Sequence, residues 1–82
     1  MATTYVVTAC NRGLGLEFAR QLSNRGDRVI ATARDLENAT ELAALDVETF
    51  ALDVADAASV ERFGEAMAGV SIDVLLNNAG VG

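Results

Sequence analysis

Short apolar runs alternate with amphipathic stretches along the 82 residues of the chain. The runs are rich in β-branched residues and end at turn-forming residues, as strands do, whereas the apolar residues between them recur every three or four positions, as in helices. Strands are predicted at residues 5–8, 28–33, 47–52 and 72–76. The first predicted helix starts at Leu14 and ends before Gly26, the second covers residues 36–44, and the third follows Asp56 and ends at Gly69.

Strands that alternate with helices of about ten residues predict βαβ units, and therefore an α/β fold built around a parallel sheet. Because the crossovers of such units are right-handed, helices are expected on both faces of the sheet. A chain of this length supports one compact unit with a small core. The helical residues predicted to reach that core are Leu14, Phe18, Leu22, Val60, Phe63 and Met67.

The composition excludes several kinds of catalytic site. The chain contains no histidine and no lysine, and Cys10 is its one cysteine. A zinc site with nitrogen and sulfur ligands, a histidine base, a lysine Schiff base and a P-loop lysine are therefore ruled out. A lone cysteine cannot form an internal disulfide, which suits a reducing compartment.

Charge and hydropathy indicate which partners are disfavoured. The net charge is −6, which argues against nucleic acid and against an anionic membrane surface. No apolar run approaches the roughly 20 residues that span a bilayer, and the first residues carry no basic leader. We therefore expect a cytoplasmic protein without nucleic-acid or membrane partners.

A glycine-bearing turn follows the first predicted strand and opens the first predicted helix, at residues 8–15. The free N–H groups and the dipole of a helix N-terminus favour an anion at such a place, and Gly13 and Gly15 allow a phosphate group and the neighbouring strand to approach closely. The general G-x-G-x-x-G pattern is not met, because its last position is Phe18. The spacing alone therefore leaves nucleotide binding and a simple tight turn as equal alternatives.

Three short motifs, taken together, resemble those of the short-chain dehydrogenase/reductase family. Residues 8–15 are similar to its glycine-rich element, Asp53-Val54 to its adenine-binding pair, and residues 77–80 (Asn-Asn-Ala-Gly) to its N-N-A-G element. The motifs occur in the family's order, each after a predicted strand, and they extend over the whole chain. One departure is Ala9, which stands where the family's first motif glycine is expected.

The resemblance implies a three-layer Rossmann-type half-fold with strand order 3-2-1-4 and a nicotinamide cofactor in the crevice between strands 1 and 4. It also implies hydride transfer between that cofactor and a carbonyl or alcohol. The serine, tyrosine and lysine that carry the family's catalysis lie downstream of N-N-A-G, so no catalytic residue is assigned in this chain. Residues 1–82 are thus interpreted as an NADP-binding half-domain, with a non-catalytic nucleotide-binding module and a purely structural half-fold as alternatives.

The resemblance assigns the cofactor site to specific residues. The loop backbone is expected to hold the diphosphate, Asp53 and Val54 the adenine, and Asn77 the adenine-side ribose, while Asn78 ties strand 4 to its neighbour. Asn11 either holds the loop shape or faces solvent. The full set of cofactor-binding residues is Ala9, Cys10, Asn11, Arg12, Gly13, Leu14, Gly15, Arg34, Asp53, Val54, Asn77, Ala79 and Gly80.

Two arginines favour NADP over NAD as the cofactor. A site for NAD usually places an acid near the end of strand 2, about 20 residues beyond the glycines, where this chain has Ala33 followed by Arg34. Arg34 and Arg12 would form charge-assisted bonds to a 2′-phosphate. Two solvated arginines are the alternative. Asp35, which directly precedes the second predicted helix, is expected to be its N-cap rather than a ribose contact.

The last predicted strand, residues 72–76, is nearly all apolar and carries neither a lysine nor a proline to protect an exposed edge. Such an edge offers unpaired N–H and C=O groups to another strand. A homodimer, or self-association, is therefore expected through residues 72–76.

Overall fold

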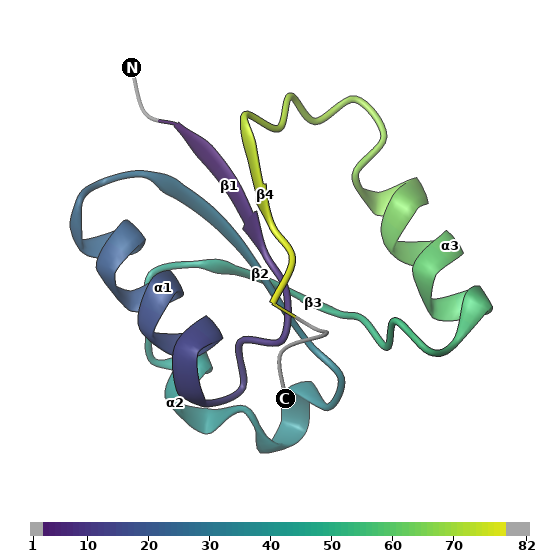
Figure 1. The fold of residues 1–82 in the computed structure, drawn as a ribbon, viewed down its shortest axis with the longest axis horizontal. Coiled ribbons are helices and arrows are strands. Elements are labelled where there is room, and N and C mark those ends of the chain that lie inside the picture. Colours follow the sequence, from purple (N-terminus) through teal and green to yellow (C-terminus); the bar gives the residue numbers. More distant parts are fainter. Residues whose placement is uncertain (1–2, 79–82) are drawn as a thin grey trace.

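The structure is a computed structural model that describes residues 3–78 as a single sheet flanked by helices (Figure 1). Its strands are β1 (Thr4–Val7), β2 (Arg28–Ala33), β3 (Glu48–Ala51) and β4 (Val74–Leu76). Its helices are α1 (Gly13–Asn24), the 3₁₀ helix η1 (Leu36–Asn38), α2 (Thr40–Ala43) and α3 (Ala57–Ala66).

All strand pairs are parallel, and the strand order is β3-β2-β1-β4, as predicted. In this register Val6 of β1 lies opposite Ile30 of β2 on one side and Leu75 of β4 on the other. The carboxyl ends of the strands therefore meet at one edge, and the order of the chain reverses between β1 and β4.

Helices cover both faces of the sheet, with α1 and α2 on one side and α3 on the other (Figure 1). Leu22 of α1 and Leu42 of α2 pack on the face that carries Val7 and Ala31. The opposite face carries the fully buried Ile30. On that side, the ring of Phe63 from α3 meets Phe50 of β3 edge to face, with centroids 5.9 Å apart.

The assignment of three residues to the core was wrong. Leu14 and Phe18 are 55% and 36% exposed, and Val60 is 46% exposed. In α1 the buried face consists instead of Gly15, Ala19 and Leu22. Small residues at the first two of these positions let the helix axis lie close to the sheet, which leaves the neighbouring row of larger side chains at the surface.

The single helix predicted at 36–44 is divided into η1 and α2. Asp35 caps η1, as predicted, because its carboxylate accepts the backbone N–H of Glu37, but it also accepts the side-chain amide of Asn38. Asn38 is thus held by a local bond that competes with helix continuation. Ala39 then leaves the helical region at φ −91° and ψ 57°.

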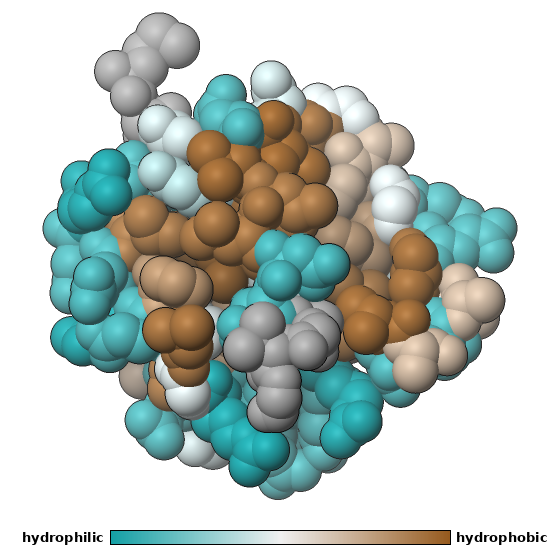
Figure 2. All heavy atoms as spheres, in the orientation of Figure 1, coloured by the Kyte–Doolittle hydropathy of each residue, from teal (hydrophilic) through white to brown (hydrophobic). Residues whose placement is uncertain are grey.

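The outer edge of β4 lies beside an apolar surface. Within residues 3–78, β4 pairs with β1 only. Leu75 is 61% exposed, Ile72 is also exposed, and Figure 2 shows apolar atoms gathered over this part of the sheet. None of the helices in the described part of the chain is both long enough and apolar enough to cross a membrane.

Candidate functional site

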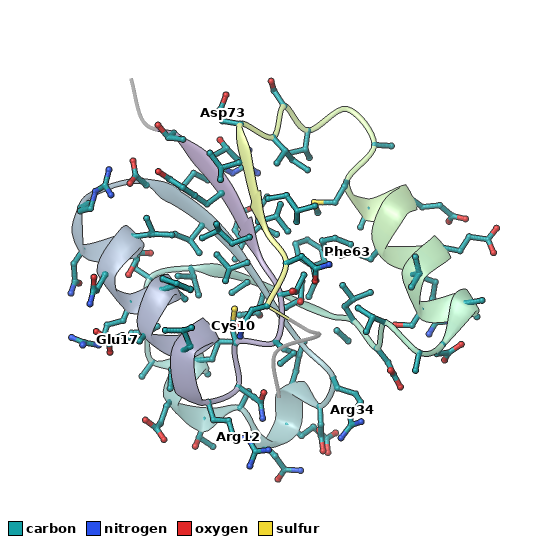
Figure 3. All side chains as sticks on the ribbon, in the orientation of Figure 1. Cys10, Arg12, Glu17, Arg34, Phe63 and Asp73 are labelled. Carbon is teal, nitrogen blue, oxygen red and sulfur yellow. The ribbon has the colours of Figure 1, made fainter. Side chains whose placement is uncertain are left out.

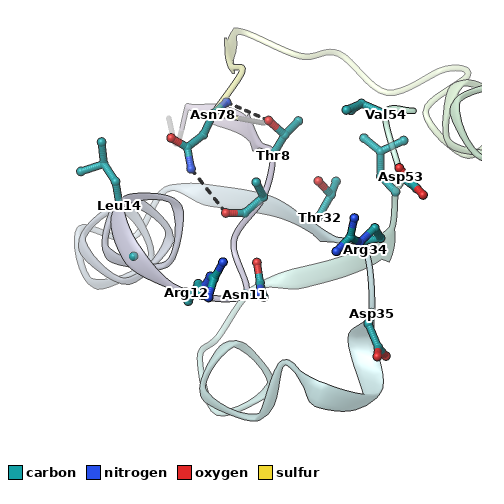
Figure 4. A pocket seen from close by; sticks show the side chains of 13 residues that line it. Thr8, Asn11, Arg12, Leu14, Thr32, Arg34, Asp35, Asp53, Val54 and Asn78 are labelled. Atoms are coloured by element: carbon teal, nitrogen blue, oxygen red, sulfur yellow. Dashed lines mark hydrogen bonds between the residues drawn. The ribbon is translucent and has the colours of Figure 1, made fainter. Parts of the chain in front are cut away.

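A cleft of about 550 Å³ opens at the carboxyl edge of the sheet (Figure 4). Residues that follow β1, β2 and β3 line it, together with the first residues of α1. Eight of the residues predicted to bind the cofactor lie there: Ala9, Asn11, Arg12, Gly13, Leu14, Arg34, Asp53 and Val54.

The loop between β1 and α1 forms one wall of the cleft. Two of its residues, Ala9 at φ +56° and Gly13 at φ +61°, are in the left-handed region, and they turn the chain from the strand into the helix. The backbone N–H of Cys10 donates to the carbonyl of Thr32 over 2.7 Å and holds the loop on β2. The first N–H groups of a helix have no partner within it, so this wall can accept an anion.

Gly15 is the point where α1 touches the loop most closely. A Cβ atom on Gly15 would lie 2.3 Å from the carbonyl oxygen of Ala9 and 2.7 Å from the side-chain nitrogen of Asn78. Gly15 is buried within this contact and does not line the cleft. Its role is therefore to permit close packing, and only a residue without a side chain can fill it.

Thr8 connects β1 to the end of β4. Its hydroxyl donates to the side-chain oxygen of Asn77 over 3.1 Å and accepts the backbone N–H of Asn78 over 2.8 Å. The side-chain amide of Asn78 also reaches the carbonyl of Ala9, at 3.4 Å. The predicted tie between Asn78 and the neighbouring strand is present, and Asn77 takes part in the same network.

Cys10 lies under the loop, between α1 and the sheet, and not in the cleft (Figure 3). Its thiol is fully buried and donates to the carbonyl of Val7 over 3.0 Å. Burial raises the pKa of Cys10 from 9.0 to about 11, although a backbone hydrogen bond involving Thr32 acts in the opposite direction. The side chain is thus an unreactive core residue at neutral pH.

Arg12 and Arg34 are the basic residues among those that line the cleft. Both are exposed, and they lie at the same end of the molecule (Figure 3). Ala33, at the position where a site for NAD would carry an acid, is completely buried. Asp35 lies at the edge of the cleft, but its carboxylate is bound to the start of η1 (Figure 4).

The opposite wall is formed by the loop after β3. The backbone N–H of Leu52 donates to the carbonyl of Ala33 over 3.0 Å, which holds this loop against the end of β2. The N–H of Asp53 donates to the buried hydroxyl of Ser59 in α3 over 2.9 Å, and one carboxylate oxygen of Asp53 accepts the N–H of Ala55. Asp53 and the exposed Val54 therefore face the cleft from an anchored loop.

Five lining residues were not among those predicted to bind the cofactor: Thr8, Thr32, Asp35, Leu52 and Asn78. All five lie at or just after the carboxyl ends of the parallel strands, so the rule that ligands bind at those ends would have found them. Asn77 is not among the residues that line the cleft. Ala79 and Gly80 lie outside the described residues.

Residues 3–82 match the sequence model of the short chain dehydrogenases. The chain belongs to this family. It is 38% identical to (+)-neomenthol dehydrogenase of Arabidopsis thaliana over 94% of its own length and 30% of the relative's. It is 37% identical to human retinol dehydrogenase 11, of which it covers 27%. The chain thus spans between about a quarter and a third of the length of these curated relatives.

Solved structures of the short chain dehydrogenase family have the same fold. A metagenomic short-chain oxidoreductase in complex with NADP is 38% identical, with a TM-score of 0.78 over 98% of this chain and 40% of the other. Menthone neomenthol reductase from Mentha piperita is 34% identical, with a TM-score of 0.80 over 96% of this chain and 32% of the other. These likenesses show that the chain has the fold of the corresponding part of these family members.

Proposed function

We propose that the cleft binds NADP(H), and that residues 1–82 form the cofactor-binding half-domain of an oxidoreductase acting between carbonyls and alcohols. The observation that carries this proposal is the meeting of Arg12 and Arg34 at one cleft that also contains the N-terminus of α1. A chain with twice as many acidic as basic residues thus brings two of its six basic residues to one small site.

Each part of the cleft fits one part of the cofactor. The residue 9–15 backbone suits the diphosphate, because it combines a helix N-terminus with a glycine that keeps the approach open. Asp53 and Val54 suit the adenine, through one acceptor and one apolar contact. Arg34 and Arg12 suit the 2′-phosphate, and the buried Ala33 places no carboxylate at the end of β2, where a site for NAD usually carries one.

A bound nicotinamide dinucleotide would supply or accept the hydride. The matching proton must come from elsewhere, since the chain has no lysine or histidine and its one tyrosine, Tyr5, lies inside β1. We assign the proton transfer to residues in the part of the relatives' sequences that this chain does not match. We also propose a cytoplasmic location, with which a chain that contains a single, free cysteine is compatible.

Calorimetry with 2′-phospho-ADP and ADP tests the cofactor assignment. The 2′-phosphate should tighten binding at least tenfold, because a charge-assisted hydrogen bond contributes about 1.5–3 kcal/mol. Arg34→Ala should remove most of that preference, whereas Arg62→Ala, an exposed arginine of α3 outside the cleft, should not. Equal binding of the two ligands would refute NADP and favour an adenine-nucleotide module, and no binding would favour a structural half-fold.

We further propose that the β4 edge pairs with β4 of a second copy, antiparallel, to form one continuous sheet. The outer edge of β4, which pairs with no strand within residues 3–78, supports the proposal, and the exposed Leu75 would gain an apolar cross-strand neighbour. Light scattering over a dilution series should show a dimer or larger species at micromolar concentration, and Leu75→Lys should shift it to the monomer. A monodisperse monomer of 8.6 kDa at high concentration would disprove it.

A further inference from the structure

Thr32 is a buried polar residue at the base of the cleft. It is the fifth residue of β2, only 1% exposed, and it lines the cleft together with Leu52 and Asp53. Its hydroxyl oxygen has no hydrogen-bond partner within residues 3–78. Figure 4 shows this hydroxyl between Thr8 and the loop that carries Asp53 and Val54.

An unpartnered hydroxyl in the protein interior needs a physical explanation. Burying a polar group without a hydrogen bond costs free energy, and nearly all such groups in folded proteins find a partner. Valine has almost the same shape and would fill this place in β2 without that cost. The hydroxyl of Thr32 is therefore best explained by a partner that enters the cleft.

The position of Thr32 selects the part of the ligand that it would meet. Thr32 lies opposite Phe50 in the register of β2 and β3, next to the loop whose Leu52 N–H bonds to Ala33. The buried Leu52 and the exposed Val54 give this end of the cleft apolar walls, and Asp53 adds one acceptor. An apolar slot with a few polar groups suits a planar base better than a phosphate.

We propose that the hydroxyl of Thr32 forms a hydrogen bond with the purine ring of the bound nucleotide, so that Thr32 is a binding residue for the base. The inference rests on the proposed nucleotide site. It adds to that site a contact at the base of the cleft, where Thr32 lies between the Asp53 loop and the loop after β1. A hydroxyl both donates and accepts, so it can serve a ring nitrogen or the exocyclic amine.

Calorimetry with ADP and urea unfolding, performed on the same variants, test the proposal. Thr32→Val should raise the Kd for ADP about five- to tenfold, which corresponds to the loss of one hydrogen bond. The urea midpoint of the ligand-free protein should stay the same or rise, because an unsatisfied group is removed. Thr32→Ser should keep the affinity within about twofold by retaining the hydroxyl, and Thr49→Val, on exposed β3, should leave both measurements unchanged.

The possible outcomes separate this inference from the proposed function. If the unaltered protein binds ADP and Thr32→Val binds it equally well, the base contact is refuted and the nucleotide site stands. A lower urea midpoint for Thr32→Val would also refute it, since the hydroxyl would then have a partner inside the protein.

If the unaltered protein binds neither ADP nor 2′-phospho-ADP, the proposed function fails and the contact fails with it. If Thr32→Val does not fold, Thr32→Ser and Thr32→Ala provide the same comparison of a hydroxyl with none.

Discussion

The hydroxyl of Thr8 accepts the backbone N–H of Asn78 over 2.8 Å, so that residues 70 positions apart in the chain join the ends of β1 and β4. The same hydroxyl donates to the side chain of Asn77. Thr8 is itself buried, and the loop that forms one wall of the cleft begins at the next residue. The Thr8 hydroxyl and the Asn78 amide, which reaches the carbonyl of Ala9 at 3.4 Å, thus hold that loop against the end of β4.

Thr8→Val should lower the free energy of unfolding by about 1–3 kcal/mol, because the part-buried N–H of Asn78 and the side chain of Asn77 lose their bonds to the hydroxyl. Thr8→Ser retains the hydroxyl and should recover most of the loss. Urea unfolding monitored by circular dichroism measures both. A valine variant as stable as the unaltered protein would show that this bond contributes nothing.

Gly15→Ala should destabilise the protein by about 1–3 kcal/mol, the usual cost of forcing an extra methyl group into a packed contact. The new Cβ would collide with the backbone of Ala9, which cannot move without shifting the loop. Gly64→Ala is the matched control: Gly64 lies inside α3 and nothing approaches its Cβ position, so the change should stabilise the helix by up to about 1 kcal/mol. Thermal unfolding of the two variants should therefore shift in opposite directions.

Ala9→Gly should stabilise the protein, by about 0.5–1 kcal/mol, because residue 9 has a φ of +56°, a conformation that costs an alanine about 1–2 kcal/mol. Ala51→Gly, an exposed position in β3 without a positive φ, should instead destabilise. The comparison requires only chemical denaturation. Destabilisation by both glycines would contradict strain at Ala9.

The raised pKa of Cys10 predicts a specific loss of stability at high pH. The pKa rises from 9.0 in the exposed thiol to about 11 in the fold, so the folded state retains its proton longer than the unfolded state. The contribution of the neutral thiol to the free energy of unfolding is complete below pH 9, and it is lost as the pH rises through about 11. The unfolding free energy of the unaltered protein should therefore fall more steeply over that interval than that of Cys10→Ala. Parallel curves for the two proteins would refute this.

The parallel sheet could be predicted from the regular alternation of strands and helices, whereas the order of the strands and the place of the cleft followed from the family resemblance carried by the motifs at strand ends. The buried face of α1 could not be predicted. Leu14 and Phe18 form a regular apolar row, but the helix turns Gly15 and Ala19 toward the sheet, and that choice depends on how closely the helix approaches the loop. A period of hydrophobicity identifies a helix more reliably than the face that it buries.

The second helix failed as a prediction for a different reason. Ala39 and Leu42 are buried within the predicted segment, but the chain there forms two short helices rather than one. The competing bond between Asn38 and Asp35 is a local interaction that apolar periodicity does not register. Thr32 was overlooked because, within a strand rich in apolar residues, a threonine resembles a valine until its hydroxyl is seen without a partner.

The attachment of α3 has a consequence for the order in which the fold opens. Only Ser59 of this helix is buried, whereas α1 buries three residues, and α3 meets the sheet through Phe63 at its outermost strand. Segments with so little buried surface exchange their amide hydrogens through local unfolding well before the core does. Since Ser59 anchors Asp53, detachment of α3 would leave this wall of the cleft held by the bond from Leu52 to β2 and would loosen Asp53. A nucleotide that binds there should therefore slow hydrogen exchange throughout a helix that it never touches.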